Sequence, residues 1–150
     1  MRLTIFTDYT LRVLIYLGVQ QRESRLATIS DIAAAYGISA NHLMKIVHHL
    51  AQQGYVDTVR GKSGGMRLAR APEQINIGTV VRGAEEDFAV VECFQQGHCS
   101  CPIVSACALK GVLGRAMSAF FEVLDHQTLE DLLKPQAQLR KIFRDAVRPT

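Results

Sequence analysis

Residues 28–54 read TISDIAAAYGISANHLMKIVHHLAQQG, a stretch with two helical patterns separated by a glycine. The alanine-rich segment Thr28–Tyr36 predicts a short helix, and Gly37 suits the left-handed position after its last turn. Ser39 is a typical N-cap for a second helix that runs to about Gly54. Apolar side chains recur at helical spacing through both segments, at Ile32, Tyr36, Ile38, Leu43 and Ile46. Two short helices joined by a turn with glycine form a helix-turn-helix.

A β-hairpin is predicted immediately after this unit. Tyr55–Val59 and Met66–Ala69 are short β-like runs, and the loop between them, residues 60–65, reads RGKSGG. A helix-turn-helix followed by a hairpin is typical of a winged helix. Such a domain places its second helix in the major groove of DNA, with the N-terminal residues foremost.

The charge distribution favours DNA binding. Asp57 is the only acid between Ala40 and Arg70, where five cations lie, and acids prevail from Ala71 to Ser100. Alanine-rich helices joined at a glycine also occur in bundles that never bind DNA, but a basic surface over a reading helix and a wing suits phosphates. We expect contacts from helix residues Ser39, Asn41, His42 and Lys45, from His48 or His49 at the backbone, and from the wing residues Arg60 and Lys62.

The remaining helices complete a mainly α fold, a winged helix-turn-helix with a small β-hairpin wing and a long C-terminal dimerisation helix. The patterns predict helices at residues 7–20, with Thr7 as N-cap, and at residues 75–84, 106–124 and 129–134, the last ended by Pro135. The apolar stripe of residues 106–124 exceeds what one small winged helix buries, which predicts a homodimer and a palindromic operator. We expect a DNA-binding domain at 1–84, a cysteine-rich loop at 85–108 and a dimerisation helix with a C-terminal tail at 106–150.

Composition excludes several classes of protein. The chain has 150 residues, of which 48% are hydrophobic and 21% charged, as in an ordinary globular protein. No apolar run approaches a membrane span, and the charges Arg2, Asp8 and Arg12 exclude a secretory signal peptide, so we expect a cytoplasmic protein. No nucleophile elbow, dinucleotide fingerprint or metal-hydrolase motif is present, and we do not expect an enzyme.

All four cysteines fall in one short segment, as Cys93-x5-Cys99-x-Cys101-x5-Cys107. In a reducing compartment such a cluster indicates a metal or redox site rather than structural disulfides. Thiolates select zinc, copper(I) or iron–sulfur clusters, and the spacing alone leaves zinc and iron–sulfur equally favoured. Plain reduced thiols and a disulfide switch between Cys99 and Cys101 are further alternatives.

Several motifs in this order resemble the Rrf-type winged-helix iron–sulfur transcription regulators. They are residues 6–9 (FTDY) with Leu11-Arg12, residues 36–45 (YGISANHLMK), residues 59–68 (VRGKSGGMRL) and the cysteine segment. The resemblance covers the chain from Met1 to about Leu133 and is strongest to the nitric-oxide-sensing branch. It implies a homodimeric repressor of promoter DNA that releases DNA when its cluster is nitrosylated.

The resemblance also implies one iron–sulfur cluster per subunit, with 4Fe–4S favoured over 2Fe–2S. Its ligands would be Cys93, Cys101 and Cys107, with Asp8 donated by the partner subunit and Cys99 as an alternative ligand. Without the resemblance, Asp8 would be read as ordinary N-terminal helix charge. The alternatives are an iron-responsive or cluster-status regulator of the same family, or a zinc- or thiol-switch DNA-binding regulator.

Overall fold

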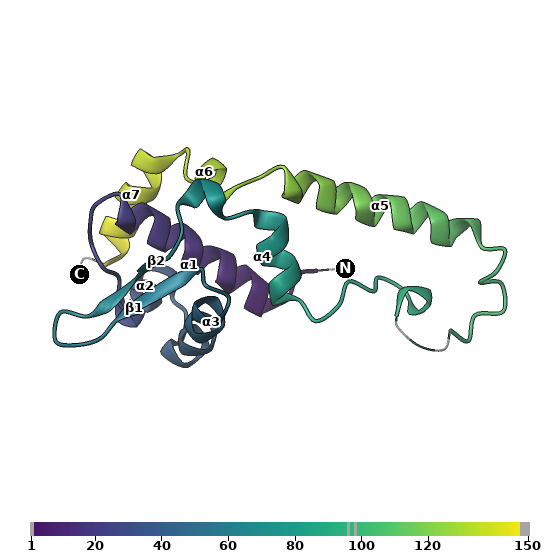
Figure 1. The fold of residues 1–150 in the computed structure, drawn as a ribbon, viewed down its shortest axis with the longest axis horizontal. Helices are drawn as coiled ribbons and strands as arrows, with labels where there is room; N and C mark the ends of the chain where they lie inside the picture. Colours follow the sequence, from purple (N-terminus) through teal and green to yellow (C-terminus); the bar gives the residue numbers. More distant parts are fainter. Residues whose placement is uncertain (1, 96, 98, 148–150) are drawn as a thin grey trace.

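The computed structural model describes residues 2–95, 97 and 99–147 (Figure 1). Residues 96 and 98 of the expected cysteine-rich loop and 148–150 of the expected tail lie outside the described residues. The elements follow in the order α1 (Ile5–Gln21), α2 (Ile29–Tyr36), α3 (Ala40–Gln52), β1 (Val56–Val59), β2 (Gly65–Leu68), η1 (Pro72–Gln74), α4 (Ile77–Ala84), η2 (Glu92–Phe94), α5 (Ala108–Asp125), α6 (Leu129–Leu132) and α7 (Gln136–Val147). This arrangement confirms the mainly α winged-helix fold.

The helix-turn-helix forms as its sequence predicts. Thr28 caps α2 and exchanges hydrogen bonds with Asp31 in a capping box, which satisfies free amides at the helix start. Gly37 ends the helix with φ 66°, in the left-handed region that favours glycine. The Ser39 hydroxyl then accepts a hydrogen bond of 3.3 Å from the amide of His42 and starts α3. The angle between α2 and α3 is therefore fixed by local chemistry.

Helix α1 is the central element and begins earlier than the sequence pattern predicted. Its N-cap is Thr4, whose hydroxyl accepts from the amide of Thr7 at 3.2 Å, so the expectation that Thr7 caps the helix is wrong. Thr7 is instead buried within the first turn. Val13, Leu14 and Leu17 are at most 1% exposed. This helix packs against α3, α4, α6, α7 and β2. Helix α1 therefore contacts both α3 and the wing strand β2.

The wing is a two-stranded antiparallel hairpin. Val56 pairs with Leu68 and Val59 with Gly65, and the bridge of Ala27 to Met66 ties the hairpin to the segment before α2. A side chain at Gly65 would stand 2.7 Å from the carbonyl oxygen of Ala27, so only glycine allows this close approach. The hairpin is thus anchored through Gly65 and Met66 of β2, close to its loop.

The C-terminal third leaves the domain and returns to it. Helix α5 forms an arm beside the cysteine segment, and α6 and α7 fold back onto α1 (Figure 1). The segment after Pro135, expected only as a C-terminal tail, forms α7, which packs Phe143 against Tyr16 and Tyr36 at ring-centroid distances of 4.9 and 5.4 Å. Within the described ranges, no helix combines the length and apolarity needed to cross a lipid bilayer.

Candidate functional site

The outer face of α3 carries the helix residues expected to contact DNA. Ser39, Asn41, His42, Lys45 and His48 are all exposed, whereas the opposite face, Leu43, Ile46, Val47 and Leu50, lies in the core. The 3.6-residue period of the helix explains this division. The face therefore presents an amide, an ammonium group and imidazoles, all of which can donate hydrogen bonds to base edges or phosphates.

Met44 of α3 was not in the expected set, and His49 was expected only as an alternative to His48. Met44 is 52% exposed on the same surface, where helical spacing puts it beside Asn41 and His48. His49, considered as an alternative to His48 for the DNA backbone, is half-buried and turns its ring toward Phe6 of α1. His49 therefore contacts the protein interior, and Met44 adds an apolar group to the outer face.

The wing loop holds the other expected DNA contacts. Arg60 and Lys62 are exposed on either side of Gly61, which has φ 115° and so favours glycine. Along the strands, Arg67 pairs loosely with Asp57 at 4.0 Å. The two loop cations are thus presented to solvent on a short connection.

Asp8 lies on the exposed side of the first turns of α1 and is paired with a cation. Oδ2 stands 2.8 Å from Nη2 of Arg12, and Nε of Arg12 donates to Oδ1 at 3.0 Å. This hydrogen bond raises the pKa of Arg12. The guanidinium also lies over the rings of Tyr9 and Tyr36, at 5.7 and 5.8 Å from their centroids. Asp8 is therefore accessible and held in a defined position.

Tyr36 connects this pair to the helix-turn-helix. Its hydroxyl donates a hydrogen bond of 3.1 Å to the carbonyl of Arg12, and burial raises the pKa of Tyr36. Because Tyr36 is the last residue of α2 and precedes the Gly37 turn, the contact joins α1 directly to the start of the turn. Arg12 thus has a polar contact with Asp8 and a backbone contact with α2.

The cysteine segment lies between α4 and α5. Cys93, Cys99, Cys101 and Cys107 are free thiols, each half-buried, with Cys93 in η2 and Cys107 directly before α5. The carboxylate of Glu92 accepts hydrogen bonds of 2.8 Å from both the amide and the hydroxyl of Ser100. These bonds lower the pKa of Glu92 and bring the residue before Cys93 close to the one before Cys101. The segment therefore already turns back on itself.

The single chain does not assemble the expected metal ligands. Among residues 2–95, 97 and 99–147, no three histidine, cysteine, aspartate or glutamate side chains are grouped so that they could hold a metal ion. Asp8 is paired with Arg12 on α1, and the cysteines lie on the segment that leads to the α5 arm. A site built from both needs a contribution from a second chain or a rearrangement of this one.

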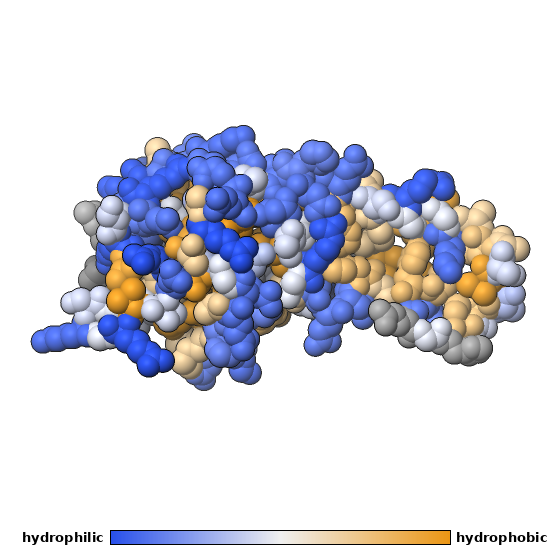
Figure 2. Space-filling view, viewed as in Figure 1, coloured by the Kyte–Doolittle hydropathy of each residue, from blue (hydrophilic) through white to orange (hydrophobic). Residues whose placement is uncertain are grey.

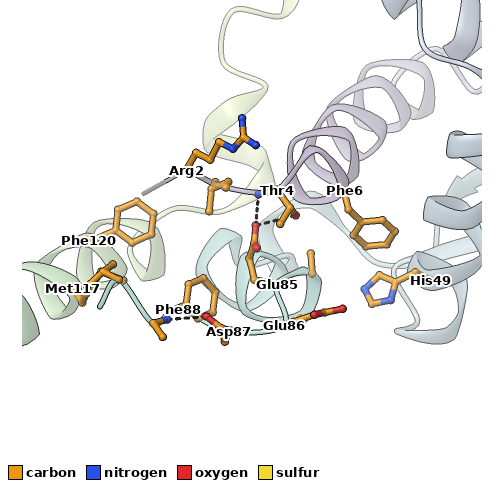
Figure 3. A pocket seen from close by; sticks show the side chains of 15 residues that line it. Arg2, Thr4, Phe6, His49, Glu85, Glu86, Asp87, Phe88, Met117 and Phe120 are labelled. Atoms are coloured by element: carbon orange, nitrogen blue, oxygen red, sulfur yellow. Dashed lines mark hydrogen bonds between the residues drawn. The ribbon is translucent and has the colours of Figure 1, made fainter. Parts of the chain in front are cut away.

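An open cleft separates the start of α1 from the segment after α4. Its volume is about 1060 Å³, and Phe6, His49, Glu85, Phe88 and Phe120 are among its lining residues. Figure 3 shows the contact between Thr4 and Glu85. The Glu85 carboxylate accepts hydrogen bonds of 2.7 Å from the amide of Thr4 and of 3.1 Å from the hydroxyl of Thr4. The cleft thus lies beside Phe6 and His49, and the hydrogen bonds of Thr4 to Glu85 connect its two sides.

Comparisons with known proteins agree over nearly the whole chain. The family model Rrf2, described as an iron-dependent transcriptional regulator, matches residues 3–135. The HTH-type transcriptional regulator NsrR of Bacillus licheniformis is 49% identical over 143 residues, which cover 95% of this chain and 99% of that protein. NsrR of Bacillus subtilis is also 49% identical, over 96% of this chain and 98% of that protein.

Solved structures give the same result. IscR of T. potens superposes with a TM-score of 0.69 at 26% identity, over 90% of this chain and 88% of that one. CymR, the global cysteine regulator of B. subtilis, has a TM-score of 0.72 at 29% identity, over 88% and 95%. These relatives are regulators rather than enzymes. Taken with the winged-helix fold, the matches show that this chain belongs to the Rrf2 family of transcriptional regulators.

Proposed function

We propose that the chain is a dimeric repressor whose affinity for promoter DNA depends on an iron–sulfur cluster that nitric oxide attacks. The proposal rests on the separation of the expected ligands between two parts of the chain. Soft thiols lie on the segment before α5, and an exposed carboxylate, Asp8, lies on α1. A second copy of the chain would bring the two together across the dimer. The NsrR name of the relatives and the family's iron-dependent description support the same function.

DNA binding is assigned to α3 and the wing. We infer that Ser39, Asn41, His42, Lys45 and His48 face the major groove and that Arg60 and Lys62 hold phosphates or enter the minor groove. The exposure of these side chains supports the assignment, because each one is accessible to DNA. Replacing Lys62 with alanine would weaken binding to all sequences alike and lower the salt slope by about one, whereas Asn41→Ala would relax sequence preference.

The donor set fits an iron–sulfur cluster. Cys93, Cys101 and Cys107 would be the thiolate ligands, with Asp8 of the partner subunit as the fourth, and Cys99 is the alternative to Cys101. When bound, the cluster supplies iron that reacts with nitric oxide. The four thiols are half-buried and lie within one short segment. The hydrogen bond from the amide of Ser100 to Glu92 folds this segment back on itself. A 4Fe–4S form is favoured, and a 2Fe–2S form would use the same residues.

Dimerisation is assigned to α5. Leu109, Val112 and Val123 are 61%, 49% and 65% exposed, and Figure 2 shows apolar residues gathered along this arm. With Ala116 and Ala119 they follow alternating spacings of three and four, the pattern of a helix that packs against another helix. A twofold dimer would present two copies of α3 about 34 Å apart to successive major grooves and would require a palindromic operator. We therefore propose residues 106–150 as the dimerisation part, residues 1–84 as the DNA-binding part and residues 85–108 as the cluster-binding part.

In this proposal Asp8 transmits the signal. While Asp8 is a ligand, the first turn of α1 is tied to the partner's cysteine segment, and the spacing of the two α3 helices is fixed. Release of Asp8 after reaction with nitric oxide would free the start of α1, and the spacing would be lost. Because α1 packs against most elements of the domain, a modest movement suffices to disturb α3.

The decisive experiment is anaerobic purification with an absorption spectrum, followed by titration with nitric oxide while binding to promoter DNA is measured. We expect a visible iron–sulfur band that bleaches as the DNA complex dissociates. Cys101→Ser and Cys99→Ser form a matched pair: the first should lose the cluster and the second retain it. Colourless protein that binds its promoter fully and ignores nitric oxide would instead identify a zinc- or thiol-switch regulator. Release on iron limitation alone would identify an iron-responsive or cluster-status regulator.

A further inference from the structure

We propose that the ring pair Phe6–His49 couples the position of Asp8 to the recognition helix α3, and that this pair accounts for part of the difference in DNA affinity between the cluster-loaded and cluster-free protein. The inference rests on the proposed function, because it requires Asp8 to be a ligand. It assigns a positioning role to two residues that contact neither the expected cluster nor the expected DNA surface.

The rings next to Asp8 contact α3 at two points. Phe6, two residues before Asp8, meets the ring of His49 edge-on, with centroids 5.3 Å apart and planes at 76°. Tyr9, one residue after Asp8, lies 6.4 Å from the ring of His42. His42 and His49 are seven residues apart and so share one side of α3. The first turns of α1 thus contact both ends of the recognition helix.

Asp8 and Phe6 lie on different sides of one rigid helix. The carboxylate of Asp8 is exposed, whereas Phe6 packs on the core cluster and its carbonyl accepts a 2.8 Å hydrogen bond from the hydroxyl of Thr10. Since the backbone of these turns moves as a unit, a pull on Asp8 rotates or shifts Phe6 as well. His49 is the side chain of α3 that meets Phe6.

The surroundings of the ring pair leave room for such a shift. Phe6 and His49 border the open cleft of about 1060 Å³, and Figure 3 shows both rings at its edge. The start of α1 is tethered across the cleft by the hydrogen bonds of Thr4 to Glu85. In contrast, Val13 and Leu14 farther along the helix are fully buried. The side of the first turn that carries Phe6 therefore faces open space, whereas Thr7 packs its other side into the core, and the ring pair lies on the open side.

His49 and its neighbour His48 differ in exposure, and this difference allows the coupling to Asp8 to be tested separately from direct DNA contact. His48 is exposed on the outer face, whereas His49 is half-buried and directed at α1. A change at His49 should therefore leave the direct contacts with DNA intact. Its effect should appear in the response to cluster loading instead.

The test compares two forms of each variant on one duplex, selected from random DNA by the cluster-loaded wild-type protein. The Kd is measured for cluster-loaded and for cluster-free protein, and the ratio of the two is the coupling. We expect Phe6→Leu and His49→Gln each to reduce this ratio about twofold to tenfold, the range of one aromatic pair. Iron content, the absorption spectrum and the Kd of the cluster-free form should not change. The double variant should lose no more than either single variant, because both remove the same contact.

Amide hydrogen exchange of α3 gives a second readout. In the wild type, loading the cluster should raise the protection of α3, and in both variants this increase should shrink. His126→Gln, at the far end of α5 where the ring contacts the carbonyl of Glu122 in its own helix, is the matched control and should retain the full ratio. If Phe6→Leu does not fold, His49→Gln provides the same measurement with Phe6 in place.

The outcomes separate this inference from the function on which it rests. An unchanged ratio in Phe6→Leu and His49→Gln, alongside an Asp8→Ala variant that loses it, overturns the coupling role and leaves the proposed function standing. A full ratio with a stable cluster in Asp8→Ala overturns both. A lower affinity of the cluster-free variants that leaves the ratio intact would show an ordinary structural contact and also overturns the inference.

Discussion

Asp8 and Arg12 face each other one turn apart on α1, joined by a 2.8 Å ion pair and a 3.0 Å hydrogen bond. Both side chains are more than 40% exposed, so the pair itself adds little to stability. Its position is more informative. If Asp8 binds iron in the partner subunit, as proposed, it has to leave this guanidinium, and Arg12 would then compete with the cluster for Asp8.

Arg12→Gln should consequently slow cluster loss. Glutamine removes the competing charge, and we expect the release of iron to a chelator to slow about two- to fivefold, the equivalent of one exposed ion pair. The free energy of unfolding should fall by less than about 1 kcal/mol. Arg22→Gln, which breaks the pair with Glu130 at the other end of α1, is the control and should leave the release rate unchanged. Faster release from Arg12→Gln would mean that Arg12 guides Asp8 to the cluster rather than competing for it.

The junction of α4 and α5 depends on a close approach at Gly78. A Cβ atom there would overlap Oδ1 of Asp125, which forms a two-point ion pair with Arg82. We expect Gly78→Ala to lower the free energy of unfolding by about 1–3 kcal/mol, because Asp125 must be displaced. Urea unfolding of the cluster-free protein measures this directly.

A matched control lies five residues along the same helix. A Cβ at Gly83 would meet nothing within 4 Å, so Gly83→Ala should be neutral or stabilise by up to about 1 kcal/mol through helix propensity. Adding Asp125→Ala to Gly78→Ala should cost less than the sum of the two single changes, because the overlap disappears. Additive losses would show that the clash with Asp125 is not the cause.

The helix-turn-helix could be predicted from the sequence because its signals are local. Gly37 at a left-handed position and Ser39 at an N-cap set the turn without help from distant residues. The start of α1 was misplaced because Thr4 and Thr7 are both suitable caps, and the tether of Thr4 to Glu85 is a long-range contact. Long-range contacts of this kind leave no local pattern.

The candidate site was predicted unevenly for the same reason. Helical spacing put the expected DNA residues on one exposed face, and their role stays a prediction. The sequence left His48 and His49 as alternatives for the DNA backbone contact, and packing against Phe6 distinguishes them. The ligand role of Asp8 came from the resemblance alone, since its local signal is ordinary helix charge.

The missed helix α7 depends on one buried side chain. No helix was predicted after Pro135, but Phe143 is only 4% exposed and packs against Tyr16 and Tyr36. Phe143→Ala should lower the free energy of unfolding by about 3–5 kcal/mol, because it opens a cavity next to α1 and α2. Ile142→Ala, at a neighbouring position that is 58% exposed, should change it by less than about 0.5 kcal/mol. Equal effects of the two changes would show that α7 is not part of the folded domain.

Acid should destabilise the chain partly through Asp131, whose carboxylate completes the capping box that Thr128 begins at the start of α6. The ammonium of Lys134, followed by the amide and hydroxyl of Thr128, lowers the pKa of Asp131 from 3.8 to about 2. A depressed pKa means that the folded state favours the ionised carboxylate, so its contribution to stability is fully present above pH 3.8 and is lost as the pH falls toward 2. Urea unfolding of the cluster-free protein between these pH values should show a shallower loss of stability in Asp131→Asn than in the wild type.

Lys134→Ala should also make the loss of stability with falling pH shallower, because it removes the largest cause of the low pKa of Asp131. If Asp131→Asn runs parallel to the wild type over this range, the carboxylate is not held in its ionised form by these partners.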